Sequence, residues 1–397
     1  MHKIERLLQT LVPKGVEFRK LGEVCEILDN RRIPIAKNKR NPGIYPYYGA
    51  NGIQDYIDSY IFDGDFVLVG EDGSVINKDN TPVVNWASGK IWVNNHAHVL
   101  QTKNELKLKF LYFYLQTIDV SYCVAGTPPK INQENLKKIT IPIPPLEIQQ
   151  EIVKILDAFT ELNTELNTEL NARKKQYEYY QNMLLDFNDI NQNHKDAKIK
   201  TYPKRLKTLL QTLAPKGVEF RKLGEVCDFQ KGKSITKKAV TFGKVPVISG
   251  GRQPAYYHNE ANRSGETIAI SSSGVYAGYV SYWDIPVFLA DSFSVSPKQK
   301  TLMPKYLFHY LTTQQDAIHA TKSTGGIPHV YSKDLQNFLI PIPPLEIQQE
   351  IVKILDQFSL LTTDLLAGIP AEIKARKKQY EYYREKLLTF KPLQNKE

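Results

Sequence analysis

Cysteine is scarce in this chain, with Cys25, Cys123 and Cys227 the only three among 397 residues. An odd and sparse set argues against a disulfide framework and favours a reducing compartment. The three residues form no CxxC pair and no cysteine–histidine cluster at metal-ligand spacing. We therefore expect no metal and no cofactor.

Long apolar runs are also missing. No uncharged apolar stretch approaches the roughly 20 residues that a membrane span requires. The first residues, "MHKIERLLQTLVPKG", carry charges and Pro13 where a signal peptide needs an apolar run. The sequence favours a soluble cytoplasmic protein.

Acidic residues are outnumbered, 42 Asp and Glu against 52 Lys and Arg. The resulting net charge of +10 suggests an anionic partner, nucleic acid first and an acidic membrane second. A merely basic cytosolic protein would show the same balance.

Nucleotide-binding motifs are absent. The run "QKGKSIT" around Gly232 resembles a phosphate-binding loop, but Cys227 stands where its first glycine is required. The segment "DFVLVGEDGSV" has glycines after a strand but no GxGxxG. "NPGIYPYY" at 41–48 is not the NPPY-type motif of an amino-methyltransferase.

Two candidate catalytic or metal groups are weak. His96 and His98 lie together in "NNHAH", but no acidic or cysteine partner stands at ligand spacing, so we expect polar residues at a strand edge. Glu71 and Asp72 are paired acids, yet the second half of the chain has Ser272 and Ser273 at the matching place. A duplicated catalytic centre would not readily lose both acids, so the sequence predicts a binding module without catalytic residues.

The chain consists of two copies of one unit, near 1–202 and 203–397. Three segments recur almost unchanged: "LLQTLVPKGVEFRKLGEVC" at 7–25 and 209–227 (with one Val-to-Ala difference), "IPIPPLEIQQEIVKILD" at 141–157 and 340–356, and "ARKKQYEYY" at 172–180 and 375–383. Two copies predict a pseudo-twofold object.

The blocks between these repeats, 26–138 and 228–337, resemble each other only faintly. Matching pairs are "IYPYYGANGIQDY" with "KVPVISGGRQPAY", "DGDFVLVGEDGSV" with "SGETIAISSSGVY", and "KFLYFYLQT" with "KYLFHYLTT". One fold with two diverged surfaces indicates two different targets. The alternative is that the two copies of a duplicated gene diverged by neutral drift wherever the sequence tolerates change.

The fold class predicted is α+β, with two small mixed α/β domains separated by two long antiparallel helices. The domain boundaries expected are 1–140 and 203–339 for the globular domains, and 141–202 and 340–397 for the helical spacers. Short apolar runs ending in Gly, Asp or Asn indicate strands, and the "KFLYFYLQTI"-type segments indicate amphipathic helices.

The spacers show a heptad-like seam, which predicts a helix of about 40 residues after Pro145, or about 60 Å. The apolar positions are Ile148, Ile152, Ile155, Phe159, Leu162, Leu166, Leu170, Tyr177, Tyr180, Leu184 and Phe187. In the second copy, Gly368 and Pro370 are expected to kink or break the helix. Each seam needs a partner, so we expect an antiparallel pair that brings the chain termini close together.

Polar, glycine-rich loops follow the predicted strands in both blocks. Asn, Arg and Gln can contact base edges, and Lys and Arg neutralise phosphates. The candidate DNA-binding residues are Tyr47, Tyr48, Asn51, Asn94, Asn95, His96, Lys130, Asn132, Arg252, Gln253, Ser271, Ser272, Ser273, His329 and Tyr331. Each alone also suits an ordinary turn, so the prediction depends on their gathering on two basic, loop-rich domains.

These repeats, with "YYGANG" and "DGDFVLVGEDGS", resemble the specificity subunits of type I restriction–modification systems over essentially the whole chain. The resemblance implies that 20–140 and 222–339 are target-recognition domains, each recognising half of a gapped site in double-stranded DNA. It implies that the spacers dock two methyltransferase subunits, which restriction subunits join, and that catalysis belongs to those partners. Carried over as partner-binding residues are Glu147, Gln150, Arg173, Lys174, Tyr177, Glu346, Gln349, Arg376, Lys377 and Tyr380.

The run "TELNTELNTELN" at 160–171 departs from the second copy, where the corresponding stretch contains Gly368 and Pro370. Each TELN unit adds about 6 Å of helix and about 40° of rotation, which corresponds to roughly two base pairs of DNA. The hypothesis is that the number of units sets the gap between half-sites. A neutral expansion in a tolerant helix is the alternative.

Two other functions compete with this interpretation. One is a coiled-coil scaffold that binds proteins only, which salt-dependent DNA binding would distinguish. The other is an endonuclease or methyltransferase in its own right, for which turnover by the chain alone would be required.

Overall fold

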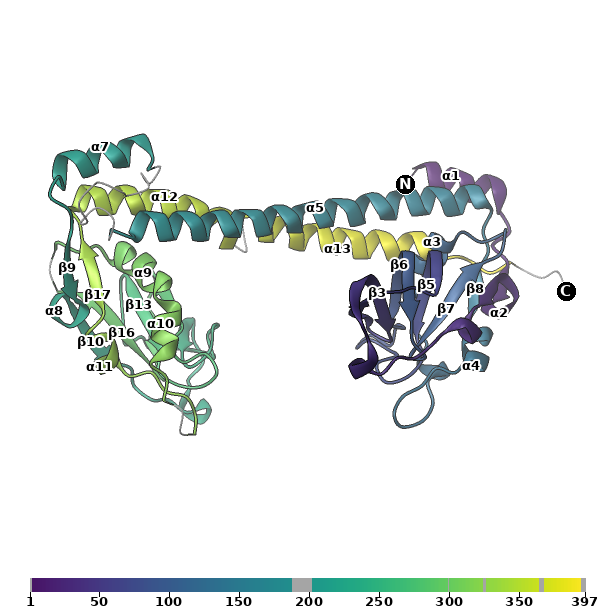
Figure 1. The fold of residues 1–397 in the computed structure, drawn as a ribbon, viewed down its shortest axis with the longest axis horizontal. Coiled ribbons are helices and arrows are strands. Elements are labelled where there is room, and N and C mark those ends of the chain that lie inside the picture. The colour runs from purple at the N-terminus through teal and green to yellow at the C-terminus, as the bar shows by residue number, and fades with distance from the viewer. Residues whose placement is uncertain (1, 188–201, 299, 324–325, 364–367, 394–397) are drawn as a thin grey trace. The chain divides into compact units, whose positions relative to one another are not determined.

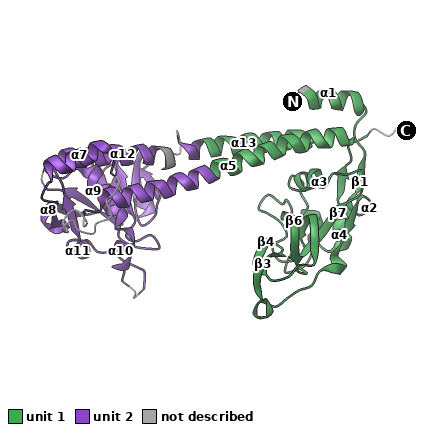
Figure 2. Ribbon diagram, turned by 45° about the horizontal axis from the view of Figure 1, so that its top comes forward, with its two compact units in different colours: residues 1–167, 372–397 green, residues 168–371 purple. Residues whose placement is uncertain are grey.

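The structure, a computed structural model, describes residues 2–187, 202–298, 300–323, 326–363 and 368–393 (Figure 1). The chain forms two compact units (Figure 2). Unit 1 comprises residues 1–167 and 372–397, and unit 2 comprises residues 168–371. Within the described ranges, no helix is both long and apolar enough to cross a membrane.

Unit 1 is built around a six-stranded mixed sheet of order β2-β7-β5-β6-β3-β4. Its elements are α1 (His2–Leu11), β1 (Phe18–Lys20), α2 (Leu21–Val24), β2 (Cys25–Ile27), the 3-10 helices η1 (Asp29–Arg31) and η2 (Lys37–Lys39), β3 (Pro42–Gly49), β4 (Gly52–Ile57), β5 (Phe62–Gly70), β6 (Val84–Val93), β7 (Ala97–Thr102), α3 (Leu108–Leu115), η3 (Ser121–Cys123), α4 (Gln133–Lys138), β8 (Thr140–Pro142) and the first part of α5 (Leu146–Leu185). Only β3 and β6 pair in parallel, at Tyr47 with Trp92 and Tyr48 with Val93.

Unit 2 repeats this strand order in two sheets, β10-β16-β13-β14 and β12-β11-β15. Its elements are α7 (Lys204–Leu213), β9 (Glu219–Lys222), α8 (Leu223–Val226), β10 (Cys227–Lys231), η4 (Lys237–Ala239), β11 (Val245–Ile248), β12 (Tyr256–His258), β13 (Thr267–Ser271), β14 (Val280–Trp283), β15 (Phe288–Leu289), β16 (Ser292–Pro297), α9 (Pro304–Thr313), α10 (Gln315–Ala320), α11 (Ser332–Leu335), β17 (Leu339–Ile342) and α12 (Leu345–Thr363). The single strand β6 of unit 1 corresponds to β14 and β15 here. Pro286 lies between the two pieces, and proline cannot donate a hydrogen bond to a strand ladder.

The predicted duplication of a mixed α/β fold is confirmed, because equivalent strands pair in the same way. Phe288 pairs in parallel with Val247, as Trp92 does with Tyr47. Asp157 of α5 forms an ion pair with Lys109 of α3 in unit 1, and Asp356 of α12 forms one with Lys305 of α9 in unit 2. The two units therefore share interactions that the faint similarity of their middle blocks does not reveal.

The long helices are present as predicted. Helix α5 is 40 residues long and uninterrupted. The second copy has two helices instead, α12 and α13 (Ile369–Leu388), and residues 364–367 between them lie outside the described part. Pro370 stands in the first turn of α13, where a missing N–H costs no hydrogen bond.

Each unit combines the start of its own spacer helix with the end of the other copy's helix. In unit 1, Ile148 and Ile152 of α5 share a core with Leu387 and Leu388 of α13. The ring of Phe159 lies 5.5 Å from that of Tyr383. Helix α5 leaves this core and α13 returns to it, so the pair is antiparallel within unit 1 (Figure 1).

Unit 2 shows the same exchange. Met183 and Leu184 at the end of α5 join the core formed by Ile347 and Ile351 of α12. The rings of Tyr180 and Phe358 stack with centroids 5.0 Å apart. The predicted antiparallel arrangement thus holds within each unit.

The predicted seam is shifted at one place. Ile155 is only half-buried, whereas the neighbouring Leu156 is fully buried. The equivalent residues of the second copy, Ile354 and Leu355, show the same difference. A helix packed against both a sheet and a second helix buries a broader stripe than a two-helix seam. The heptad rule alone therefore selected the wrong neighbour.

The chain's two end segments meet in unit 1, as expected. The Val16 N–H donates to the carbonyl of Lys391, and the Leu393 N–H donates to the carbonyl of Val16. Gly15 has a φ of +109°, and a Cβ there would lie 2.5 Å from the carbonyl oxygen of Pro392. Glycine at this position permits the close approach of the C-terminal segment.

The three cysteines are free and buried. Burial raises the pKa of Cys25 and of Cys227, at equivalent positions, to about 12. A thiol that stays protonated is a poor nucleophile, so these cysteines serve packing.

Candidate nucleic-acid interface

Three loops meet at one end of the unit 1 sheet. These are the turn after β5 (70–74), the turn before β7 (94–96) and the segment 125–133. The Glu71 N–H donates to the carbonyl of His96, and the Ile131 N–H donates to the carbonyl of Glu71. Asp72 and Lys130 form an antiparallel bridge. The loops are thus joined backbone to backbone.

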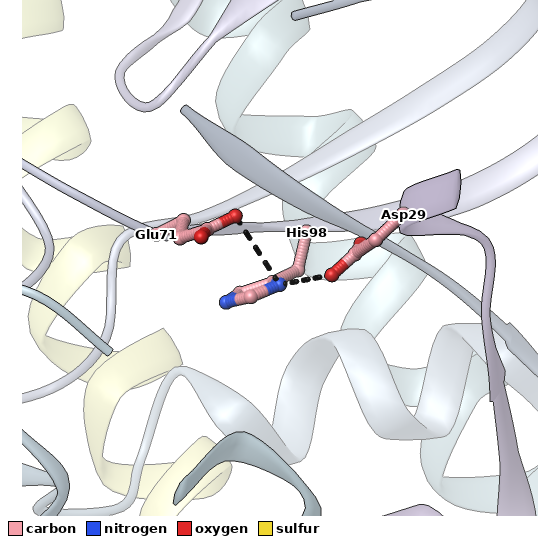
Figure 3. Close-up of side chains that lie close together, drawn as sticks. All are labelled: Asp29, Glu71 and His98. Carbon is pink, nitrogen blue, oxygen red and sulfur yellow. Dashed lines mark hydrogen bonds and ion pairs between the residues drawn. The ribbon is translucent and has the colours of Figure 1, made fainter. Parts of the chain in front are cut away.

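Below these loops lies a buried charged network, centred on His98 of β7 (Figure 3). The Nδ1 atom of His98 lies 2.6 Å from Asp29 and 3.7 Å from Glu71. Its Nε2 atom lies 2.8 Å from the carbonyl oxygen of Ile131. His98 has no exposed side-chain surface, so the expected position at a strand edge is wrong. Strand β7 lies between β2 and β5, and both of its edges are paired.

Two cationic side chains complete this network. Arg32 lies 2.5 Å from Glu71, and it also donates to the carbonyl of Ala97 at 2.8 Å. The Lys130 ammonium lies 3.1 Å from the second oxygen of Glu71. Burial by itself would raise the pKa of Asp29, but the hydrogen bond from His98, its charge, the Arg32 charge and the Val99 N–H together hold that pKa below its usual value.

Asp29, Glu71 and His98 are the cluster in the described residues whose ligand atoms lie close enough together to hold a metal ion, within 4.8 Å of one another. Arg32 and Lys130 already supply positive charge to these carboxylates. The donor set is therefore better explained as an internal ion network than as a metal site.

Unit 2 has the same backbone loop arrangement with different side chains. The Val330 N–H donates to the carbonyl of Ser272, and the Ser272 N–H donates to the carbonyl of Asp291. Ser273 bridges to His329, as Asp72 does to Lys130. Ser273 also hydrogen-bonds Asp291, at the place where Asp72 contacts His96 in unit 1.

Aromatic and basic residues gather around this second set of loops. The Arg252 guanidinium lies over the ring of Tyr276 at 4.9 Å and near that of Tyr279 at 5.6 Å. The rings of His329 and Tyr331 stack with centroids 6.0 Å apart. Such cation–π and stacked groups present flat, positively charged surfaces to an anionic ligand.

The structure places the candidate DNA-binding residues in three classes of exposure. Eight are exposed on the loops, namely Asn51, Asn95, His96, Lys130, Asn132, Arg252, Gln253 and Tyr331. Three are half-buried, namely Ser272, Ser273 and His329. Four are buried, namely Tyr47, Tyr48, Asn94 and Ser271.

The buried members hold the loops from within. The Tyr47 hydroxyl binds the backbone of Ile35, and its ring lies under the Arg40 guanidinium at 4.1 Å. Asn94 accepts from the N–H of His96 and so shapes the turn before β7. Ser271 donates to the carbonyl of Ser249. Asn132, although exposed, caps α4 by accepting from Asn135.

The candidate partner-binding residues also divide by exposure. Glu147, Gln150, Lys174, Glu346, Gln349 and Lys377 are exposed. Arg173 and Arg376 form equivalent ion pairs with Glu169 and Glu372 on their own helices.

The two tyrosines of the partner-binding set point into the protein. The Tyr177 hydroxyl lies 3.3 Å from Nδ1 of His309, and burial raises the pKa of Tyr177 to about 12. Tyr380 packs near Phe159, with ring centroids 6.3 Å apart. Tyr177 therefore joins α5 to α9 in unit 2, and Tyr380 joins α13 to α5 in unit 1.

Some residues that shape the site could not be identified from the sequence alone. Gln149 and Gln348 are fully buried, whereas their neighbours Gln150 and Gln349 are exposed. The sequence pair "QQ" does not indicate which of the two glutamines is buried. Asp29 and Arg32 stand far in sequence from Glu71 and His98. Tyr276 and Tyr279 had a visible signal, because they lie in the glycine-rich loop beside Ser273.

Comparisons with known proteins identify the class. The family described as type I restriction modification DNA specificity domain matches residues 13–175 and again 215–375. The chain belongs to this family.

Individual relatives match over nearly their whole length. A chain of Haemophilus influenzae named as a type I restriction enzyme specificity subunit is 37% identical, with 98% of each chain covered. A type I restriction enzyme specificity subunit of Escherichia coli is 31% identical and covers 98% of this chain and 97% of its own length. The crystal structure of a type I restriction–modification S subunit from M. genitalium superimposes with a TM-score of 0.67, over 96% of this chain and 98% of that one, at 20% identity, which shows a shared fold.

Proposed function

We propose that this chain is the DNA specificity subunit of a type I restriction–modification complex, acting in the cytoplasm. The observation that carries the proposal is the contrast between the two units. They share a fold and loop backbone, yet Glu71, Asp72 and Lys130 of unit 1 stand where unit 2 has Ser272, Ser273 and His329. Equal scaffolds with unequal contact residues suit the recognition of two different DNA half-sites.

Each half-site is recognised by one set of loops. In unit 1, Asn51, Asn95, His96 and Lys130 are the candidates for contact, because they are exposed around the joined loops. Buried Asn94 shapes the turn before β7 and donates its N–H to the carbonyl of buried Tyr48, whereas buried Tyr47 holds the backbone of Ile35. In unit 2, the exposed Arg252 and Gln253 can both form the paired hydrogen bonds that distinguish bases.

Arg252 offers a test of recognition by unit 2. Its guanidinium is exposed and lies over two tyrosine rings. R252A is expected to weaken DNA binding by about 1–3 kcal/mol and to relax sequence preference in one half-site only. Competition binding with DNA altered in either half measures this. R205A is the matched control, because Arg205 lies on α7, is exposed and forms an ion pair with Glu350 of α12, the helix against which α7 packs. Equal effects of R252A on both halves would contradict the assignment.

Catalysis belongs to partner subunits in this proposal. Methyltransferase subunits, two in number, would dock on the repeated spacer segments, and restriction subunits would join them. Exposed Glu147 and Gln150 in the first copy recur as Glu346 and Gln349 in the second, so one partner surface can bind twice.

The docking stoichiometry gives a second prediction. E147K with Q150A should lower methyltransferase binding from two subunits to one, and the further changes E346K and Q349A should abolish it. Native mass spectrometry measures the subunits bound. E161K, an exposed glutamate of the same helix within the TELN run, is the charge-matched control. Two bound subunits with all four substitutions would place the docking surface elsewhere.

Salt dependence separates this function from that of a protein-only scaffold. The assembled complex should lose affinity for DNA on the order of a thousandfold between about 50 and about 200 mM salt, because several phosphate contacts release counterions. A fluorescence anisotropy titration checks this. Absent or salt-independent DNA binding would support the scaffold.

A further inference from the structure

We propose that His98 is a positioning residue, held as an imidazolium, that fixes the recognition loops of unit 1. The role of these loops in recognising DNA rests on the proposed function. The way in which His98 holds the loops is argued from contacts within unit 1.

The hydrogen-bond geometry requires two donors on the His98 ring. A backbone carbonyl can only accept, so Nε2, which lies 2.8 Å from the Ile131 oxygen, carries a proton. Nδ1 faces a carboxylate oxygen of Asp29 at 2.6 Å. Asp29 also accepts from the Val99 N–H at 3.1 Å and from Gln133 Nε2 at 3.2 Å. A carboxylate surrounded by donors is ionised, so Nδ1 carries a proton as well.

Two carboxylates and two cationic side chains surround that ring. They are Asp29 of η1, Glu71 after β5, Arg32 after η1 and Lys130 in the third loop. Glu71 pairs with both Arg32 and Lys130. Asp29 lies 3.4 Å from Arg32 but only 2.6 Å from Nδ1 of His98, so its closest charged partner is His98.

This network connects the three recognition loops of unit 1. Glu71 belongs to the turn 70–74. Arg32 donates to the carbonyls of Asn95 and Ala97, on either side of the exposed His96. His98 holds the carbonyl of Ile131, next to the exposed Lys130 and Asn132. Asn95, His96 and Lys130, three of the residues proposed to contact DNA, therefore lie within or next to the residues that the network holds.

Unit 2 has no counterpart of this network among its described residues. The equivalent strand position is Phe293, because Ser271 pairs with Ser292 as Gly70 pairs with Ala97. Ser272 stands in place of Glu71. Recognition by unit 1 should therefore depend on the His98 network, whereas recognition by unit 2 should not.

The role of Asp29 follows from the ring. The bond to Ile131 needs a proton on Nε2, and a neutral ring beside the Asp29 carboxylate would keep its single proton on Nδ1 instead. Both bonds therefore exist together only in the imidazolium. In D29N the amide can donate to Nδ1 of a neutral ring, and Gln133 can turn its own amide to suit, so the bond from Nε2 to Ile131 should be kept.

The first experiment needs no DNA. ¹⁵N NMR of the histidine rings in the full chain, with H98Q to assign the signal, should show both His98 nitrogens protonated near about pH 7. D29N should show one unprotonated nitrogen. A wild-type ring with one unprotonated nitrogen overturns the proposal.

The second experiment uses the complex with methyltransferase subunits and DNA altered by one base in either half-site. In H98Q, discrimination in the unit 1 half should fall on the order of tenfold, the value of one base contact. Discrimination in the other half should hold. D29N should discriminate in both halves as the wild type does. Equal changes in both halves, or full discrimination by H98Q, overturn the proposal.

Failure of the proposed function would look different, because the wild-type complex would then modify no gapped site. Hydrogen exchange in the full chain would still decide the positioning role. Faster exchange at 71–74, 94–96 and 125–131 in H98Q, with 272–274 unchanged, supports it, and unchanged exchange overturns it.

Discussion

Removal of one TELN unit from α5 is expected to abolish modification of the original DNA site and to direct modification to a site with a shorter gap. No side chain of the run 160–171 is buried, and Leu162, Leu166 and Leu170 are only half-buried. The boundary between the two units falls inside this run, after Asn167. Both ends of α5, by contrast, are anchored in cores. The run can therefore change in length at little cost in packing.

The size of the shift follows from helix geometry. Four residues contribute about 6 Å of rise and overshoot one turn by about 40°. The rise corresponds to nearly two base pairs at about 3.4 Å each, whereas the rotation corresponds to one base pair of a duplex with about 10.5 pairs per turn. A change of one base pair would mean that rotation governs the spacing, and a change of two would mean that rise governs it.

The measurement is the methylated motif of each variant, determined by sequencing modified DNA. E161A with E165A changes the same exposed surface without changing the length, so it is the matched control and should leave the gap unaltered. An unchanged gap after removal of a unit would instead favour a neutral repeat expansion.

Substitution of Gln149 by leucine is expected to destabilise unit 1 by about 3–5 kcal/mol. The Gln149 side chain is fully buried and satisfies three backbone groups, since it donates to the carbonyls of Glu105 and Pro144 and accepts from the N–H of Lys107. Each buried group left without a partner costs about 1–3 kcal/mol. Q150A, one residue along and exposed, should change stability by less than about 0.5 kcal/mol.

Urea unfolding of the full chain measures both variants. Gln348 makes the equivalent bonds to Thr301, Met303 and Pro343 in unit 2, so Q348L should lower the stability of that unit by a similar amount. Equal stability of Q149L and Q150A would show that these bonds contribute little.

The sequence predicted the architecture well because the two copies of the unit can be compared with each other. Segments that recur unchanged mark the shared scaffold, and the 40-residue helix follows from periodicity and the flanking Pro144 and Pro145. The interruption near Gly368 follows from backbone chemistry. These are local or repeated sequence signals, which can be recognised without knowledge of tertiary contacts.

The interior of the site was less predictable. Loop composition selected Tyr47 and Asn94 together with Asn95 and His96, yet the first two are buried. Along a strand or turn, successive side chains alternate between buried and exposed positions. Only the pairing of the strands determines which of them are buried. The network around His98 joins residues about 30 to 70 positions apart, so no spacing rule could assemble it.

The central claim is that each unit recognises one half of a gapped DNA site on behalf of methyltransferase subunits. The most direct measurement is to co-express the chain with methyltransferase subunits from the same genome and to map modified adenines by sequencing. The account predicts a two-part motif with a fixed gap, of which only one half changes when residues 222–339 are exchanged for those of a relative. A complex that forms but modifies no gapped motif, or an exchange that alters both halves, would contradict it.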